Sequence, residues 1–234
     1  KKDRLGAPSS EPILTPMTRR TVMRHPVLVA CEMLEDEIHC IEKKHQIGLP
    51  AIWVDRGLHD YPARLHQRLT EIIEELDHSE YDGILLGFML CGNALDGIKA
   101  GNIPIVFPRF DDCIDMQLSQ PRDPYAFYLT AGWLKGPVSL LNIYEQTAQQ
   151  YGEKKAKKFL DLSLKNYKSL TMIDTGAYPY EETLKIPQKL SEICGLPLMR
   201  CSGNYTVLEK LLCGEWDEQF HLLRPHDTFS AIDV

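Results

Sequence analysis

The sequence predicts an α/β fold, a doubly wound, mainly parallel sheet with helices on both faces. Short, wholly apolar runs such as 26–30 are typical of strands buried on both faces. Each run is followed by a segment with apolar residues along one stripe, which indicates an amphipathic helix. Strands that alternate with helices join in parallel order, so that the helices cover both faces of the sheet.

The first half of the chain repeats the strand–helix unit four times. Pro62 suits the first turn of the second helix, where its missing N–H is not needed. The predicted strands are 26–30, 49–54, 83–88 and 103–107, and the predicted helices are 33–44, 62–78, 93–100 and 112–118.

The second half is less regular. An aromatic-rich segment is predicted to be extended, and a long, mostly helical segment follows it. These two segments are 125–134 and 140–167; the later strands are predicted at 169–174, 196–200 and 219–223, and the later helices at 180–194 and 204–212.

The domain organisation follows from composition. Residues 1–25 are rich in Pro, Gly and Ser and are expected to form a flexible arm, and residues 26–234 a single α/β domain. A net charge of -7 argues against a nucleic-acid partner. No apolar run approaches the roughly 20 residues that span a bilayer, and no secretory signal is recognisable, so we expect no membrane partner and a cytoplasmic location.

Cysteines dominate the candidate site. Ligands of open α/β sheets bind beyond the carboxyl ends of the strands. Cys31, His59, Cys91 and Cys113 each follow one of the first four strands. Thiolates and imidazoles are ligands for zinc, and thiolates also hold iron–sulfur clusters. Seven cysteines, an odd number, do not indicate a full disulfide framework, so the sequence predicts a site for zinc or an iron–sulfur cluster.

Further residues are predicted around this centre. Gly92 and Asn93 follow Cys91 and are expected to contact a bound cofactor, with Gly92 allowing a close backbone approach. Tyr178 ends a strand-end loop and is expected to cover the ligand. Arg109 and Asp112 flank Cys113 and are candidate catalytic residues that bind a substrate carboxylate and orient a ligand.

Each of these residues also has a structural interpretation. A cysteine at a strand end is often a small buried hydrophobe, and a loop histidine is often exposed. Arg109 and Asp112 could form a surface ion pair, and the loop before Tyr178 could be a turn capped by Asp174. No GxGxxG, Walker or Gly-x-Ser-x-Gly motif indicates dinucleotide binding, phosphate binding or a serine nucleophile.

Five blocks of the sequence carry a family resemblance. They are Gly87-Phe88-Met89-Leu90-Cys91-Gly92-Asn93, Pro108-Arg109-Phe110-Asp111-Asp112-Cys113-Ile114, Tyr128-Leu129-Thr130-Ala131-Gly132-Trp133, Asp174-Thr175-Gly176-Ala177-Tyr178 and Gly214-Glu215-Trp216-Asp217, with weaker ones at 30–34 and 57–59. In this order, and between about Val27 and Leu223, they resemble the blocks of the domain-of-unknown-function family 1638. Asp111 stands where the family is expected to have a histidine, and the ending 223–227 lacks an expected Pro-Gly.

The resemblance implies little about activity, because the family has no settled function. Its members are often found near corrinoid-dependent methyltransferases, which implies methyl-transfer or one-carbon metabolism with a corrinoid protein or methyltransferase as partner. The leading hypothesis is therefore a metalloprotein acting on a small-molecule substrate. Two alternatives remain: a metal-free, racemase-like enzyme in which Cys91 and Cys201 exchange a proton with the substrate, and a non-catalytic binding accessory.

Overall fold

The computed structural model describes residues 23–137 and 139–233, and it confirms the α/β fold. The predicted flexible arm at 1–25 lies almost wholly outside the described residues. Eight strands form two mainly parallel sheets, one of five strands in the order β2-β1-β3-β4-β8 and one of three in the order β5-β6-β7. The strands are β1 (Pro26–Cys31), β2 (Ala51–Val54), β3 (Gly83–Gly87), β4 (Ile105–Pro108), β5 (Ala126–Leu129), β6 (Ser169–Asp174), β7 (Leu198–Ser202) and β8 (Phe220–Leu223).

The helices and 3-10 turns connect these strands. No helix within the described ranges is both long and apolar enough to cross a membrane. The helices are α1 (Glu35–His45), α2 (Pro62–Leu76), α3 (Cys113–Gln117), α4 (Ala131–Leu134), α5 (Leu140–Tyr151), α6 (Glu153–Ser163), α7 (Tyr180–Thr183), α8 (Lys185–Cys194) and α9 (Thr206–Cys213), and the 3-10 turns are η1 (Glu32–Leu34), η2 (Arg56–Asp60) and η3 (Ala231–Asp233).

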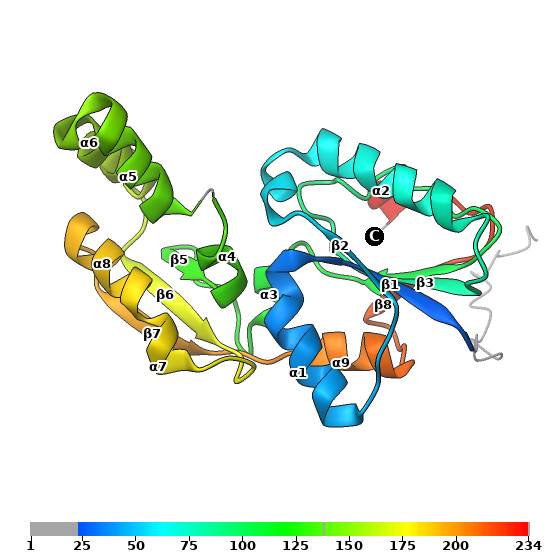
Figure 1. Cartoon of the computed structure of the whole chain (residues 1–234). Helices are drawn as coiled ribbons and strands as arrows, with labels where there is room; N and C mark the ends of the chain where they lie inside the picture. The colour runs from blue at the N-terminus through cyan, green and yellow to red at the C-terminus, as the bar shows by residue number, and fades with distance from the viewer. Residues whose placement is uncertain (1–22, 138, 234) are drawn as a thin grey trace, which may run out of the picture.

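The five-stranded sheet has helices on both faces, as predicted (Figure 1). Apolar residues of α2, such as Leu69, pack on one face, and those of α1 and α9, such as Ile38 and Leu208, on the other. β1 lies between β2 and β3 and is parallel to both, and β4 is parallel to β3. The carboxyl ends of β1, β3 and β4 therefore meet at one edge.

The three-stranded sheet forms a second unit with its own core and helices. Its core joins β5 and β6 to α4, α6 and α8, with Leu129, Leu160 and Leu190 fully buried. The chain enters this unit after α3 and leaves it after β7, and the two crossing segments form a bridge between Leu118 and Gly203.

Two predicted elements were wrong and a third is interrupted. The predicted helix at 93–100 is a series of turns, because Asn93 and Gly97 have left-handed backbone angles and Lys99 bridges Thr228. The segment 140–167 is mostly helical, as predicted, but it is interrupted at Gly152, whose φ of 84° is not helical. The extended segment at 125–134 is a strand only to Leu129, because Thr130 then caps α4 by accepting a hydrogen bond from the Trp133 N–H.

Candidate functional site

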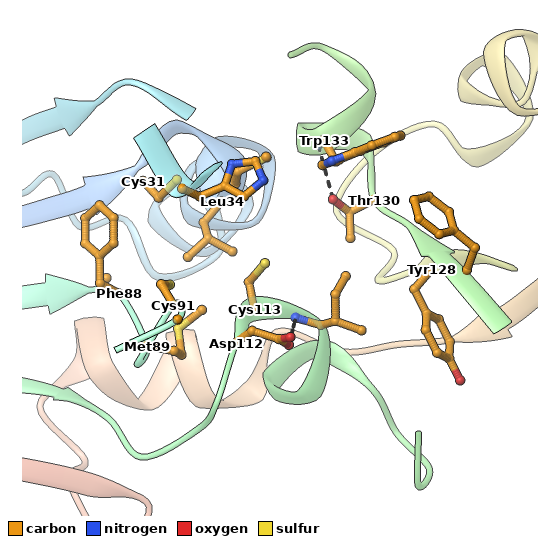
Figure 2. Close-up of a pocket in the computed structure, with 16 residues that line it drawn as sticks. Cys31, Leu34, Phe88, Met89, Cys91, Asp112, Cys113, Tyr128, Thr130 and Trp133 are labelled. Carbon is orange, nitrogen blue, oxygen red and sulfur yellow. Dashed lines mark hydrogen bonds between the residues drawn. The ribbon is translucent and has the colours of Figure 1, made fainter. Parts of the chain in front are cut away.

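The three predicted cysteines line one pocket at the carboxyl edge of the five-stranded sheet. Cys31 is the last residue of β1, Cys91 lies in the loop after β3, and Cys113 is the first residue of α3. They share a pocket with a volume of about 310 Å³ between the two sheets (Figure 2). The structure thus brings the three cysteine side chains together in the lining of one pocket.

An unusual backbone conformation places Cys91. Cys91, Gly92 and Asn93 have φ values of 45°, 68° and 68°, a run of three residues in the left-handed region. The Cys91 N–H donates to the Asp111 carbonyl at 3.0 Å, which ties this loop to the loop that carries Cys113. Non-glycine residues in this region cost about 1–3 kcal/mol each and occur at functional sites. The strain at Cys91 therefore supports a functional role for the loop.

The opposite wall of the pocket comes from the second unit. Phe127 and Tyr128 of β5, Thr130 and Trp133 line this side of the pocket. Figure 2 shows Thr130 and Trp133 across the pocket from the cysteines. The rings of Phe127 and Trp133 meet edge to face with centroids 5.7 Å apart. The sequence analysis missed this wall, although the aromatic richness of 125–134 was its signal. Apolar residues complete the lining: Met33, Leu34, Phe88, Met89 and Ile114.

The thiols are neutral in this environment. Burial raises the pKa of Cys31 to about 12 and that of Cys91 to about 11, and it raises the pKa of Cys113 well above the ordinary value. Each thiolate would also raise its neighbours' pKa, because Cys91 acts on Cys31 and both act on Cys113. Hydrogen bonds from the backbone at Met33 and Met89 act in the opposite direction, on Cys31 and Cys91 respectively. Three neighbouring thiolates therefore need a positive charge among them.

Two further predicted residues line the pocket but already have protein partners. The Asp112 Oδ1 caps α3 by accepting from the Ile114 and Asp115 N–H groups at 2.9 and 3.0 Å. Its Oδ2 accepts from Arg122 at 2.8 Å. The His59 Nδ1 lies 2.6 Å from the Arg56 carbonyl oxygen, and its Nε2 lies 3.1 Å from Asp60. A metal at His59 would have to displace one of these oxygens.

The remaining predicted residues divide between the pocket and other places. Gly92 lines the pocket, whereas Asn93, Arg109 and Tyr178 are not among its lining residues in the described chain. Arg109 is exposed and its N–H donates to the Gln219 carbonyl. The Tyr178 hydroxyl donates to the Ile173 carbonyl and thus closes its own loop.

The position of Cys201 is relevant to the alternative of a racemase-like enzyme in which Cys91 and Cys201 exchange a proton with the substrate. It is buried in β7 of the second sheet, and within the described residues it does not line the pocket that holds Cys91. A proton exchange between Cys91 and Cys201 across this pocket therefore lacks its second thiol.

Cys31, Cys91, Cys113 and His59 are of the right chemical types to bind a soft metal, but their side chains are not already arranged around a metal position. Three thiols and an imidazole are the ligand types that zinc prefers, and three or four thiols suit an iron–sulfur cluster. In residues 23–137 and 139–233, no group of three or more His, Cys, Asp or Glu side chains is already arranged to hold a metal ion. Binding would therefore require the cysteine side chains to rotate towards one another.

Comparisons with known proteins identify a family and nothing more specific. The family described as "Protein of unknown function (DUF1638)" matches residues 53–212, more than half of the chain. This range includes Cys91, Cys113 and Trp133 but not Cys31. Neither the curated proteins nor the solved structures gave a match.

Proposed function

The chain belongs to the DUF1638 family of unknown function, and we propose that its pocket holds zinc or an iron–sulfur cluster through Cys31, Cys91 and Cys113. The observation that carries the proposal is the convergence of three thiols from three strand ends on one pocket between two sheets. His59 or a small molecule would take the fourth position, an arrangement typical of a catalytic metal.

The raised pKa values of the three thiols mean that their thiolates would need a cation beside them. A metal supplies the positive charge that three adjacent thiolates need, and thiolates are the forms that ligate metals. The described lining contains no Arg or Lys that could supply this charge instead. The backbone hydrogen bonds at Met33 and Met89 favour the thiolate, as outer-shell donors do around metal-bound sulfur.

The rest of the pocket suits a small, largely apolar substrate. When bound, the metal would supply Lewis-acid chemistry, or activation of a thiol. Phe88, Phe127 and Trp133 exclude water and hold the apolar part of the substrate. The Thr130 hydroxyl accepts from the backbone N–H of Trp133 and so caps α4, the helix that carries the indole.

We include methyl transfer to a substrate thiol as the proposed reaction, with a corrinoid protein or methyltransferase as partner. The thiol loses its proton, the bond between the methyl group and its donor breaks with its electron pair left on the donor, and an S–CH3 bond forms. Its support is the family resemblance together with a thiolate-rich donor set. The seven cysteines are all free, which agrees with the reducing cytoplasm that such a site requires.

Metal analysis tests the proposal. We expect protein purified without oxygen to contain close to one equivalent of zinc, or the iron and brown colour of a cluster. Cys91→Ala and Cys113→Ala should lose the metal, whereas Cys40→Ala, a matched change outside the pocket lining, should retain it.

Two results would contradict the proposal. One is metal content below about a tenth of an equivalent in protein that was also offered zinc, cobalt or iron and sulfide. The other is equal metal content in Cys91→Ala and Cys40→Ala. A metal-free pocket whose cysteines tolerate serine would favour the non-catalytic binding accessory.

A further inference from the structure

A second cavity adjoins the thiol pocket. It has a volume of about 150 Å³ and shares Ile114, Phe127 and Tyr128 with the thiol pocket, so the two spaces adjoin at these side chains. Its other lining residues are Arg122, Asp123, Pro124, Ala126 and Tyr167. A small molecule that lies along the shared aromatic side chains can therefore contact both cavities.

Tyr128 connects the two cavities physically. Its hydroxyl end points away from the cysteines (Figure 2) and accepts a hydrogen bond from the Asp123 N–H at 2.9 Å. The Phe127 ring packs edge to face on Tyr167, with centroids 5.2 Å apart. The aromatic surface is thus continuous from the thiol pocket to the second cavity.

Arg122 is an exposed residue that lines the second cavity. Its Nη1 donates to both Asp112 at 2.8 Å and Asp115 at 3.2 Å. Among the described residues, its Nε and Nη2 have no hydrogen-bond partner. A guanidinium carries five N–H donors, and two donors on one edge match the two oxygens of a carboxylate.

Asp112 and Asp115 pair with this guanidinium, and Asp123 lines the same cavity. The Asp123 Oδ1 accepts from the Tyr125 N–H at 2.9 Å, while its Oδ2 has no hydrogen-bond partner in the described part of the chain. Asp112, Asp115 and Asp123 together outweigh the single charge of Arg122, and Asp111 is also near Asp115. A simple anion would meet three or more carboxylates, and a simple cation would meet the guanidinium. A ligand that carries both charges side by side matches both groups.

We infer that the second cavity binds the zwitterionic head of a free amino acid, with its carboxylate on Arg122 and its ammonium group on Asp123. The amino acid's side chain would extend along Phe127 and Tyr128 towards the cysteines. The inference names the substrate class of the proposed function, and it rests on that function for the chemistry at the thiol end. It also assigns to Arg122 the carboxylate-binding role that sequence analysis expected of Arg109.

Three probes with the same alkyl chain test the inference by calorimetry. L-norleucine carries both charges, hexanoate lacks the amine, and pentylamine lacks the carboxylate. We expect L-norleucine to bind at least about tenfold more tightly than either of the others, because only it satisfies both groups. Equal binding of hexanoate, or of pentylamine, would overturn the inference, and so would the absence of L-norleucine binding.

Substitutions locate the head group. Asp123→Asn keeps an acceptor for the Tyr125 N–H, so the turn is retained while the charge is lost. We expect Asp123→Asn and Arg122→Gln to weaken L-norleucine binding about tenfold or more, and Arg68→Gln, which alters a surface ion pair on α2, to leave it unchanged. Unchanged binding in Asp123→Asn, with an unchanged melting temperature, would overturn the inference.

The same titrations on metal-free protein and on Cys91→Ala separate this inference from the proposed function. The head-group cavity contains none of the three cysteines, so L-norleucine should bind in both samples. Amino acid binding without any metal binding would contradict the proposed function alone. Metal binding without amino acid binding would contradict the inference alone.

Discussion

The carboxyl edges of the two sheets look alike in sequence but differ in what their side chains do. At the edge of the five-stranded sheet, Cys31, Cys91 and Cys113 face a cavity. At the edge of the three-stranded sheet, protein partners occupy the polar groups: Asp174 accepts from Arg200, and Thr175 donates to Glu37 at 2.8 Å. Position at a strand end therefore does not by itself identify a functional residue; a side chain must also lack a structural partner.

Backbone conformation separates the two edges in the same way. The loop after β3 holds two non-glycine residues, Cys91 and Asn93, in the left-handed region. In the loop after β6, the residue in that region is Gly176, which adopts it without steric cost. Backbone strain is thus present at the edge of the five-stranded sheet, where the thiols lie, and is avoided by glycine at the edge of the three-stranded sheet. This contrast predicts that changes at the first edge affect ligand binding, whereas changes at the second affect mainly stability.

The largest expected effect concerns alkaline pH. The pKa of Cys31 is raised to about 12 and that of Cys91 to about 11 from an ordinary value of 9.0. A difference of one pH unit between the pKa values in the folded and unfolded chain corresponds to about 1.4 kcal/mol in the free energy of unfolding. The unfolded chain loses these protons first. The contribution of the two thiols to the free energy of unfolding is therefore constant below pH 9, and it falls by several kcal/mol as pH rises towards 11 and 12. Urea denaturation of metal-free protein across this window measures the fall.

A variant with serine at all three pocket cysteines provides the control for this effect. Its stability should depend less on pH above 9, because serine does not ionise there. Cys194→Ser, at a cysteine outside the pocket lining, should keep the full dependence. An identical slope in the triple variant would show that the pocket thiols are not the groups responsible.

The second prediction concerns the contact that brings the two edges together. A Cβ on Gly132 of α4 would lie 2.0 Å from the carbonyl oxygen of Met33 in η1, so α4 would have to move away from the first unit. We expect Gly132→Ala to reduce the free energy of unfolding by about 3 kcal/mol and to weaken ligand binding, because the neighbouring Trp133 lines the pocket. Gly48→Ala, whose Cβ would have open space, is the matched control. Wild-type stability in Gly132→Ala would contradict this account of the interface.

The cysteine side of the site could be predicted from the sequence, because it depends on local hydrophobic patterns. Apolar runs and helical stripes indicated β1, β3 and β4, and parallel order then brought Cys31, Cys91 and Cys113 to one edge. The opposite wall could not be predicted in this way, since Phe127 pairs with Leu170 of β6 and reaches the cysteines only through the packing of α4 on η1. Such contacts depend on residues far apart in the chain, which periodicity does not report.

The positions of Arg109 and Tyr178 also could not be predicted from the sequence pattern. Both stand at strand ends in the sequence, and both lie outside the thiol pocket lining, because short-range hydrogen bonds or exposure place them elsewhere. Arg122 had no such signal: it lies in an irregular segment, and only the fold brings it beside Asp112. Residue type and strand position predicted the location of the site better than its charged groups.

The third prediction tests the second edge alone. Thr175→Val removes the hydroxyl that donates to the buried Glu37 carboxylate and leaves that group without this partner. We expect a loss of about 2 kcal/mol in the free energy of unfolding at neutral pH and metal binding within about twofold of wild type. Burial raises the pKa of Glu37, so the loss should shrink as the pH falls and the carboxyl is protonated. A large drop in metal affinity with intact stability would reverse the roles that we assign to the two edges.

The smallest predicted effect concerns Asp112, the residue of the first edge that combines both roles. It lines the pocket and also caps α3, which begins at Cys113. Asp112→Ala should cost about 1 kcal/mol through loss of the cap, and Asp112→Asn much less, because asparagine caps nearly as well. Since the cap orients the turn that carries Cys113, Asp112→Ala should also weaken metal binding by about tenfold, as loss of an outer-shell group does. Equal stability losses in the two variants would assign the effect to the ion pair between Asp112 and Arg122 instead. The turn that carries Cys113 would then be held by this ion pair rather than by the helix cap.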